Sequence, residues 1–389
     1  MKTALIALVA ASSAFIVCAP ADAQQKSARI GVISILNGPL ALNGKEIVLG
    51  IDQAMKKLDN KIGGFPAQTF VEDAKMTVET AQLAASKLIE QNKVDFLLGN
   101  ILSNQLLAYA PRATEANVIV MSSIPGPSDL AGKNCSANVF VYSWENNSPS
   151  EAVGKSMTDK GSKKAFFIAQ NYVTGKEHVA GAKFYYKGDV AGEAYVPFNQ
   201  TDFAAEIAQI RAVGADAVYA FMPGAAGISF IKQFTNSGLR DKVKLFGGSW
   251  LADEHSFAAL GDDALGMNIA APWFAPMDNP TSKAFVEAFR KDNGRNPVFY
   301  AAFAYDSVMA LDAAVKAVGS LDDKNAIRKE LAKGQFSSVR TGFGLNTNHM
   351  PVQTYYAGEV VKKDGQLQHA IGNVIFKDQK DRFYQDCKM

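Results

Sequence analysis

The sequence has few of the residues and motifs that most often carry out chemistry. Its four histidines are His178, His255, His349 and His369, and no two of them have the spacing of metal ligands. We expect each to be a surface or structural residue. The sequence also lacks a glycine-rich phosphate loop, a Gly-x-Gly-x-x-Gly after the first predicted strand, and a Gly-x-Ser-x-Gly nucleophile turn. It therefore predicts no metal, no cofactor and no enzymatic activity.

Clusters of one charge are also missing. The sequence has 40 Lys and Arg against 38 Asp and Glu, which gives a net charge of +2, and the basic residues are scattered. A nucleic-acid-binding face would need these residues to be grouped. We therefore expect no nucleic acid partner.

Long hydrophobic runs are absent beyond the N-terminus. There, the mainly apolar stretch Ala4–Val17 follows Lys2 and precedes the small-x-small sequence Ala21–Ala23. This order is typical of a secretory signal peptide, residues 1–23, cleaved after Ala23 and too short to anchor in a membrane. No later segment approaches the roughly 20 apolar residues of a membrane span. We therefore expect an exported, soluble, periplasmic protein.

Cysteine is scarce. Removal of the signal peptide would take Cys18 with it and leave Cys135 and Cys387. In an oxidising compartment an even pair of cysteines favours a disulfide, although two unrelated buried thiols also fit the sequence. A bridge would join the C-terminal tail to the middle of the chain.

The sequence does contain a regular alternation of apolar strands and amphipathic helices. It predicts strands at residues 28–35 and 94–98 and helices at 44–58 and 78–91, and the same order returns after residue 164. Such alternation predicts parallel sheets with helices on both faces. Its repetition predicts two similar α/β lobes in succession.

The ends of the predicted strands are rich in glycine, proline, serine and asparagine. Ligands of open α/β sheets bind beyond the carboxyl ends of the strands, so these loops would line one cleft between facing lobes. In VDFLLGNILSNQ, for example, a buried strand stops at Gly99 and Ser103 opens a short helix. A hydroxyl and backbone N–H groups at such a junction favour an anion. Ser103 can also serve as a helix cap, and the two roles are compatible.

Five segments resemble, in the same order, blocks of the type I periplasmic binding proteins of the branched-chain amino acid kind. They are IGVISILNGPLALNGKEIVLGIDQA, VDFLLGNILSNQ, VIVMSSIPGPSDLAGKN, ALGDDALGMNIAAPW and NPVFYAAFAYDSVMAL. The resemblance implies two doubly wound lobes, residues 26–145 plus 273–348 and residues 146–272 plus 349–389. Three crossovers would join these lobes.

The resemblance also implies how such a protein works. Its two lobes would close around a small ligand, and the protein would then deliver this ligand to the membrane permease of an ABC transporter. We expect it to act as a monomer.

The same resemblance suggests a ligand site. In leucine/isoleucine/valine-binding relatives, the ligand's carboxylate lies at positions that correspond here to Ser103 and the loop 123–126. Aromatic and apolar residues near the strand ends would pack on the rest of the ligand. The expected ligand-binding residues are Ser103, Asn104, Ser123, Ile124, Gly126, Tyr172, Phe221, Trp250, Leu42 and Tyr300.

The sequence departs from the amino-acid-binding relatives at one position. Those relatives hold the ligand's ammonium with an acid just after the strand that ends here at Phe246, whereas this chain has Ser249 and Trp250. A buried ammonium without a counter-charge is costly. The sequence therefore favours a small carboxylate with an aromatic or apolar body. A branched-chain or other hydrophobic amino acid is the alternative ligand, and a secreted α/β hydrolase is the alternative outside the binding class.

Overall fold

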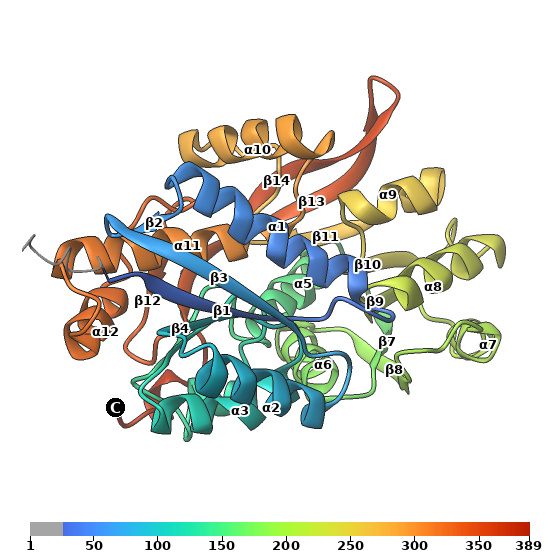
Figure 1. Cartoon of the computed structure of the whole chain (residues 1–389). Coiled ribbons are helices and arrows are strands. Elements are labelled where there is room, and N and C mark those ends of the chain that lie inside the picture. Colours follow the sequence, from blue (N-terminus) through green and yellow to red (C-terminus); the bar gives the residue numbers. More distant parts are fainter. Residues whose placement is uncertain (1–25) are drawn as a thin grey trace, which may run out of the picture.

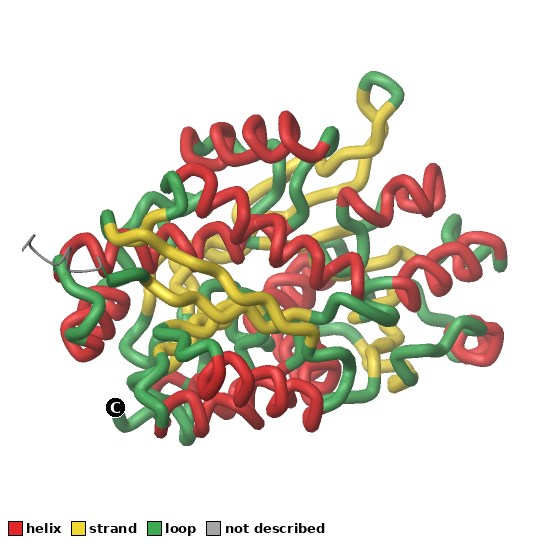
Figure 2. The backbone as a smooth tube through the Cα atoms, viewed as in Figure 1, coloured by secondary structure: helices red, strands yellow, loops and turns green. Residues whose placement is uncertain are grey.

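Two β-sheets flanked by helices form residues 26–389, the part of the chain that the computed structural model describes (Figure 1 and Figure 2). The predicted signal peptide lies outside these residues. Each sheet is mainly parallel, which confirms the α/β class expected from the sequence. Among the described residues, no helix has the length and apolar character that crossing a bilayer requires.

The first sheet has six strands in the order β2-β3-β1-β4-β5-β6. All neighbours are parallel except β2 and β3. The strands are β1 (Ala28–Ser34), β2 (Lys61–Ile62), β3 (Phe65–Asp73), β4 (Phe96–Gly99), β5 (Ile119–Ser122) and β6 (Val139–Val141). Every residue of β4 and β5 is buried. Because successive side chains of a strand point to opposite faces, both faces of these two strands are therefore covered by helices.

Helices from distant parts of the chain cover the first sheet. Figure 1 shows α2 and α3 on one side of β1, and α1 and α11 on the other. The helices of this lobe are α1 (Ala41–Lys57), α2 (Val78–Ser86) with the π-helical turn η1 (Lys87–Gln91), α3 (Ser103–Glu115), α10 (Pro280–Asn293), α11 (Phe299–Val318) and α12 (Lys324–Ala332). Since α11 packs on α1, the segment after residue 271 returns to the first lobe.

The second sheet has eight strands, in the order β12-β13-β11-β10-β9-β7-β8 with β14 paired to β13. Strands β7 to β11 pair in parallel, whereas β13 is antiparallel to both β11 and β14. The strands are β7 (Lys164–Gln170), β8 (Asp189–Val196), β9 (Ala217–Phe221), β10 (Lys244–Gly248), β11 (Asn268–Ala271), β12 (Gly344–Leu345), β13 (Pro351–Lys363) and β14 (Gln366–Gln379). The helices are α5 (Ser148–Asp159), α6 (Val173–Tyr185), α7 (Ala204–Ala212), α8 (Ala225–Asn236) and α9 (Glu254–Leu260).

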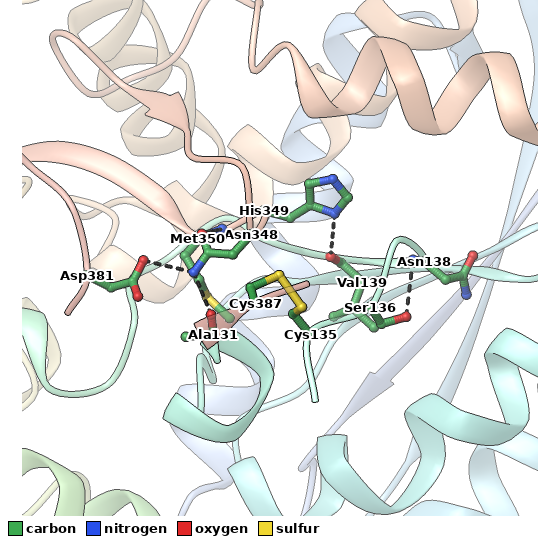
Figure 3. The surroundings of a disulfide bond; sticks show 10 residues. All are labelled: Ala131, Cys135, Ser136, Asn138, Val139, Asn348, His349, Met350, Asp381 and Cys387. Atoms are coloured by element: carbon green, nitrogen blue, oxygen red, sulfur yellow. Dashed lines mark hydrogen bonds between the residues drawn. A yellow bond between two sulfur atoms is a disulfide. The ribbon is translucent and has the colours of Figure 1, made fainter. Parts of the chain in front are cut away.

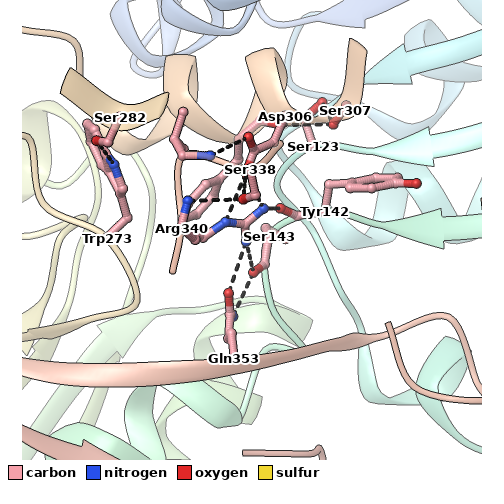
Figure 4. A network of polar contacts seen from close by, with 12 residues as sticks. Ser123, Tyr142, Ser143, Trp273, Ser282, Asp306, Ser307, Ser338, Arg340 and Gln353 are labelled. Atoms are coloured by element: carbon pink, nitrogen blue, oxygen red, sulfur yellow. Dashed lines mark hydrogen bonds and ion pairs between the residues drawn. The ribbon is translucent and has the colours of Figure 1, made fainter. Parts of the chain in front are cut away.

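The chain passes between the two lobes three times, and the buried Arg340 of the third passage is bonded to the first passage and to α11 (Figure 4). Arg340 donates to the Asp306 carboxylate on α11 (2.9 Å) and to the backbone oxygens of Tyr142 (2.6 Å) and Ser143 (3.1 Å). It also donates to the side chain of Gln353 on β13 (2.9 Å). These bonds satisfy the buried guanidinium and fasten both passages to α11. The predicted lobe boundaries themselves stay a prediction.

A disulfide joins Cys135 to Cys387, with the two Cα atoms 5.6 Å apart (Figure 3). It fastens the tail that follows β14 to the loop after α4 (Ser128–Ala131). Nearby, the Asn348 amide donates to the backbone oxygen of Ala131 (2.7 Å) and to the carboxylate of Asp381 (3.0 Å). The pairing predicted from the cysteine count is therefore present, and the tail of the second lobe is bound to the first.

Candidate ligand-binding site

A cavity lies between the two lobes, beyond the carboxyl ends of the strands. It is lined by Ile101, Ile124, Pro125, Trp144, Asn146, Tyr172, Thr174, His178, Phe221, Pro223, Trp250, Phe299 and Tyr300. Its volume is about 20 Å³, roughly the space that one water molecule requires. A ligand with a ring therefore needs the lobes to lie further apart than they do here.

Half of the expected ligand-binding residues line this cavity. They are Ile124, Tyr172, Phe221, Trp250 and Tyr300. Leu42 does not, because its side chain is 62% exposed. It lies instead at the mouth of the cleft, in a wider pocket of about 230 Å³, here called the outer pocket, and Trp250 lines both this pocket and the cavity.

Ser103 lies directly behind the lining residues, and its oxygen accepts two hydrogen bonds. The donors are the Asn146 amide (2.9 Å) and the Thr174 hydroxyl (2.8 Å), both of which belong to side chains that line the cavity. A serine hydroxyl has two acceptor positions and one donor proton, so the proton is left for a third group. Ser103 does not cap α3, because Leu102 is the N-cap residue and makes no side-chain capping bond. Asn104 follows it on α3, and its buried side-chain oxygen has no partner among the described residues.

The loop after β5 carries the other N–H groups that the sequence predicts as donors to an anion. The Ser123 N–H donates to the Gly99 carbonyl (3.1 Å) and the Gly126 N–H to the Asn146 side-chain oxygen (3.1 Å). These donors are therefore occupied, and the Ile124 N–H is the one we expect to reach a ligand. The Ser123 hydroxyl lies 3.1 Å from that of Ser307 on α11. A Cβ at residue 126 would lie 1.9 Å from the Trp144 carbonyl, so only glycine fits there.

Trp250 lines the cavity at the position where the amino-acid-binding relatives have an acid. Its indole Nε1 donates to the backbone oxygen of Ala220 (3.1 Å), which fixes the ring. The ring lies 5.0 Å from that of Phe221 and 6.0 Å from that of Trp144, measured between centroids. Such a cluster offers a large, rigid apolar surface to a flat ligand.

Acidic side chains lie near the cavity but do not line it. Asp253 caps α9 by accepting a hydrogen bond from the Ser256 N–H (2.9 Å), and it faces the outer pocket. Glu177 accepts hydrogen bonds from the Asn146 amide (2.6 Å) and the Ser128 N–H (3.0 Å) across the lobes. Burial raises the pKa of both carboxyls. A ligand ammonium in the cavity would therefore meet no carboxylate among the lining residues.

Several residues of the cavity were not predicted from the sequence. Trp144 comes from the first passage between the lobes, and Phe299 from the start of α11. His178 was expected to be a surface or structural residue; its side chain is buried and bonded to Ser150, as a structural residue would be, and it also lines the cavity. The spacing of Thr174 and His178 could have indicated this, because residues four apart share one face of a helix.

Comparisons with known proteins agree with this arrangement. Residues 27–366 match the family described as "Periplasmic binding protein". The Leu/Ile/Val-binding protein homolog 6 of Brucella melitensis biotype 1 is 28% identical over 348 residues, which cover 86% of this chain and 88% of that protein.

Two crystal structures of ABC transporter solute-binding proteins from R. palustris have a similar fold. One, in complex with benzoate, has a TM-score of 0.88 and 27% identity and covers 94% of this chain and 100% of that chain. The other, in complex with 4-hydroxybenzoate, has a TM-score of 0.87 and 25% identity and covers 92% of this chain and 99% of that chain. With its two lobes, three passages and interlobe cavity, this chain belongs to the type I periplasmic binding proteins of the branched-chain amino acid family.

Proposed function

We propose that this protein is the periplasmic solute-binding component of an ABC uptake transporter and binds a small aromatic or apolar carboxylate between its lobes. The observation that carries the proposal is the composition of the cavity. Hydroxyl and N–H donors lie on its first-lobe side, aromatic rings line the rest, and no acidic side chain is among the lining residues. The benzoate and 4-hydroxybenzoate complexes of the similar proteins support this ligand class.

The donors favour a carboxylate for a physical reason. Ser103 is the first residue of α3, whose N-terminal dipole attracts an anion, and the loop that carries the Ile124 N–H is bonded through Ser123 to Gly99, just before this helix. Each hydrogen bond to a charged group contributes about 1.5–3 kcal/mol. The rings of Tyr172, Phe221 and Trp250 would then contact the body of the ligand and provide most of its apolar contact area.

A branched-chain or other hydrophobic amino acid is the second candidate. The relatives named Leu/Ile/Val-binding proteins favour it, as does the position of Asp253. The negative charge of Asp253 helps to raise the pKa of Tyr300, after the larger effect of burial, so the carboxylate lies near one wall of the cavity. An ammonium would have to pass Tyr300 to reach this carboxylate.

We expect binding without catalysis. The family consists of solute-binding proteins, which removes the main reason for the hydrolase alternative. Among the described residues, no group of three or more histidine, cysteine or acidic side chains is arranged to hold a metal ion. The proposed partner is the membrane permease of the transporter, and the monomeric state stays a prediction.

A thermal-shift screen of the protein without residues 1–23 tests the proposal. Benzoates, phenylpropanoates and branched-chain amino acids would be compared at equal concentrations. A ligand at 100 times its Kd stabilises the folded state by about 2.7 kcal/mol, and we expect this shift with aromatic acids. A shift with leucine, isoleucine or valine alone would favour the second candidate. Recovery of a chemically altered ligand, detected by mass spectrometry, would contradict the absence of catalysis.

A further inference from the structure

We propose that His178 donates a hydrogen bond to the ligand and thereby selects aromatic carboxylates with a hydrogen-bond acceptor on the ring, at the end away from the carboxylate. This inference rests on the proposed function and narrows its ligand class. His178 is a side chain of α6 that lines the cavity and is only 1% exposed. None of the first-lobe donors described above could make this contact, because they belong to the carboxylate end of the site.

A chain of three buried side chains fixes which nitrogen of His178 carries the proton. The Tyr219 hydroxyl lies 2.7 Å from the Ser150 hydroxyl, which lies 2.6 Å from Nδ1 of His178. If Nδ1 carried the proton, it would donate to Ser150 and Ser150 to Tyr219. The proton of Tyr219 would then have no acceptor among the described residues. In the opposite direction, Tyr219 donates to Ser150 and Ser150 to Nδ1. Only the Nε2 proton is then without an acceptor, and His178 lines the cavity, where a ligand can accept it, whereas Tyr219 does not.

The imidazole proton is therefore on Nε2, the nitrogen that has no hydrogen-bond partner among the described residues. The ring is also neutral, because burial holds the pKa of His178 well below its usual value. Its close neighbours, Ser150, Phe221 and Trp250, carry no charge that would offset this effect. The cavity thus contains a neutral N–H donor among aromatic side chains.

Packing holds this donor in one orientation. The His178 ring stacks on Phe221 at 3.9 Å between centroids, with 16° between the planes. Its other neighbour, Trp250, meets it edge-on at 4.5 Å and is itself held by its bond to the Ala220 carbonyl. A donor fixed in this way loses little conformational entropy when a ligand accepts its hydrogen bond.

The position of His178 on its helix suggests which part of the ligand it meets. Thr174, four residues earlier, donates to Ser103 at the carboxylate end. Four residues advance about 6 Å along a helix, a length comparable with that of a benzoate. A carboxylate at Ser103 would therefore place ring position 3 or 4 near Nε2 of His178. A phenolic oxygen there can accept the hydrogen bond.

Calorimetry with three ligands tests the inference. 4-Hydroxybenzoate offers an acceptor at position 4, benzoate offers none, and 4-aminobenzoate offers a donor and only a poor acceptor. We expect 4-hydroxybenzoate to bind about 3- to 10-fold more tightly than benzoate, and 4-aminobenzoate to bind more weakly than benzoate. If Nε2 were an acceptor instead, 4-aminobenzoate would bind at least as well as benzoate, which would overturn the proposal.

Two variants separate the donor from the residues that position it. His178→Phe keeps an aromatic ring against Phe221 but removes the donor. In this variant the affinity for 4-hydroxybenzoate, divided by that for benzoate, should fall close to one. Tyr219→Phe removes the hydroxyl proton that fixes the tautomer of His178 through Ser150. The same ratio should therefore also fall, although Tyr219 does not line the cavity. Tyr186→Phe is the matched control, because the buried Tyr186 hydroxyl has no hydrogen-bond partner among the described residues. It should retain the wild-type ratio.

Nitrogen chemical shifts of the His178 imidazole provide a readout that needs no ligand. We expect Nε2 to be protonated in the wild type and the two tautomers to mix in Tyr219→Phe. A wild-type proton on Nδ1 would overturn the inference even if aromatic acids bind. Binding of benzoate with no preference for 4-hydroxybenzoate would overturn it while leaving the proposed function intact. If no aromatic acid bound at all, both would fail.

Discussion

The hydroxyl of Thr174 on the second lobe donates to the hydroxyl oxygen of Ser103 on the first, at 2.8 Å. Asn146, from the first passage between the lobes, donates to the same oxygen. Both donors belong to side chains that line the cavity. Closure of the lobes and orientation of the Ser103 proton are therefore coupled, because Thr174 reaches Ser103 only when the lobes lie close together.

Ser103→Ala should weaken binding of an aromatic carboxylate by about 1.5–3 kcal/mol, since a hydrogen bond to a charged group is lost. Thermal stability should also fall, because the buried Asn146 amide and Thr174 hydroxyl lose their acceptor, although no capping bond of α3 is lost. Calorimetry and thermal unfolding measure the two quantities separately. Thr114→Ala is the control, because its hydroxyl lies at the far end of the same helix and donates to the Ala110 carbonyl. Unchanged affinity with reduced stability would show that Ser103 has only a structural role.

Much of the fold could be predicted from the sequence because both sheets are mainly parallel. Buried parallel strands such as β4 and β9 are continuous apolar runs, and glycines mark where they end. The β13–β14 hairpin was not predicted. Most residues of β14 are exposed, so its sequence lacks the apolar run or regular alternation that indicates a strand.

The same reasoning explains which site residues could be predicted. Phe221 is the last residue of β9 and Trp250 follows β10, and the carboxyl ends of these parallel strands meet at one edge of the sheet. Trp144 and Phe299 come from a passage between the lobes and from a distant helix, and no local pattern places them near that edge. Leu42 also follows a strand end, but it turns outward to the mouth of the cleft. The sequence could not show whether a side chain near a strand end turns into the cavity, as Phe221 does, or outward, as Leu42 does.

The Cys135–Cys387 disulfide gives a prediction about mass and stability. The intact mass of the non-reduced protein should lie about two daltons below that of the all-thiol form. Replacing both cysteines by serine should lower the free energy of unfolding by about 2–4 kcal/mol, because the bridge closes a long loop of the unfolded chain. Denaturant unfolding measures this change. Two thiols that can be alkylated in the native, unreduced protein would contradict the prediction.

The buried Glu46 on α1 predicts how stability depends on pH. Its carboxylate pairs with Arg295, and with Nε2 of His255 on the other lobe at 3.1 Å. Burial alone would raise the pKa of Glu46, but its hydrogen bonds and the charges of His255 and Arg295 together hold it below the usual 4.5. The folded-state pKa is therefore below the unfolded one. The stabilisation is present above the unfolded pKa and is lost as the pH falls through the folded pKa.

Glu46→Gln should accordingly be less stable than the wild type at pH 7 by about 1–3 kcal/mol, since the partly exposed Arg295 loses a charged hydrogen-bond partner. This difference should shrink at acid pH, because the wild-type carboxylate then also becomes neutral. Thermal unfolding from pH 3 to pH 7 measures the trend. Asp292→Asn is the control, because its partner Lys56 is exposed and such surface pairs contribute little. A difference between wild type and Glu46→Gln that does not vary with pH would contradict the assignment.

Trp250 should make the protein discriminate against an amino group. 3-Phenylpropanoate and phenylalanine differ only by this group, and the ammonium of phenylalanine would lose its water without gaining a carboxylate among the lining residues. Calorimetry should therefore show tighter binding of phenylpropanoate. Trp250→Ala should weaken it by about 2–3 kcal/mol through lost apolar contact, and Trp250→Phe by less. Trp250→Glu should recover part of the affinity for phenylalanine by restoring a counter-charge. Tighter binding of phenylalanine to the wild type would instead assign the cavity to amino acids, with Asp253 as the acid that we would expect to receive the ammonium.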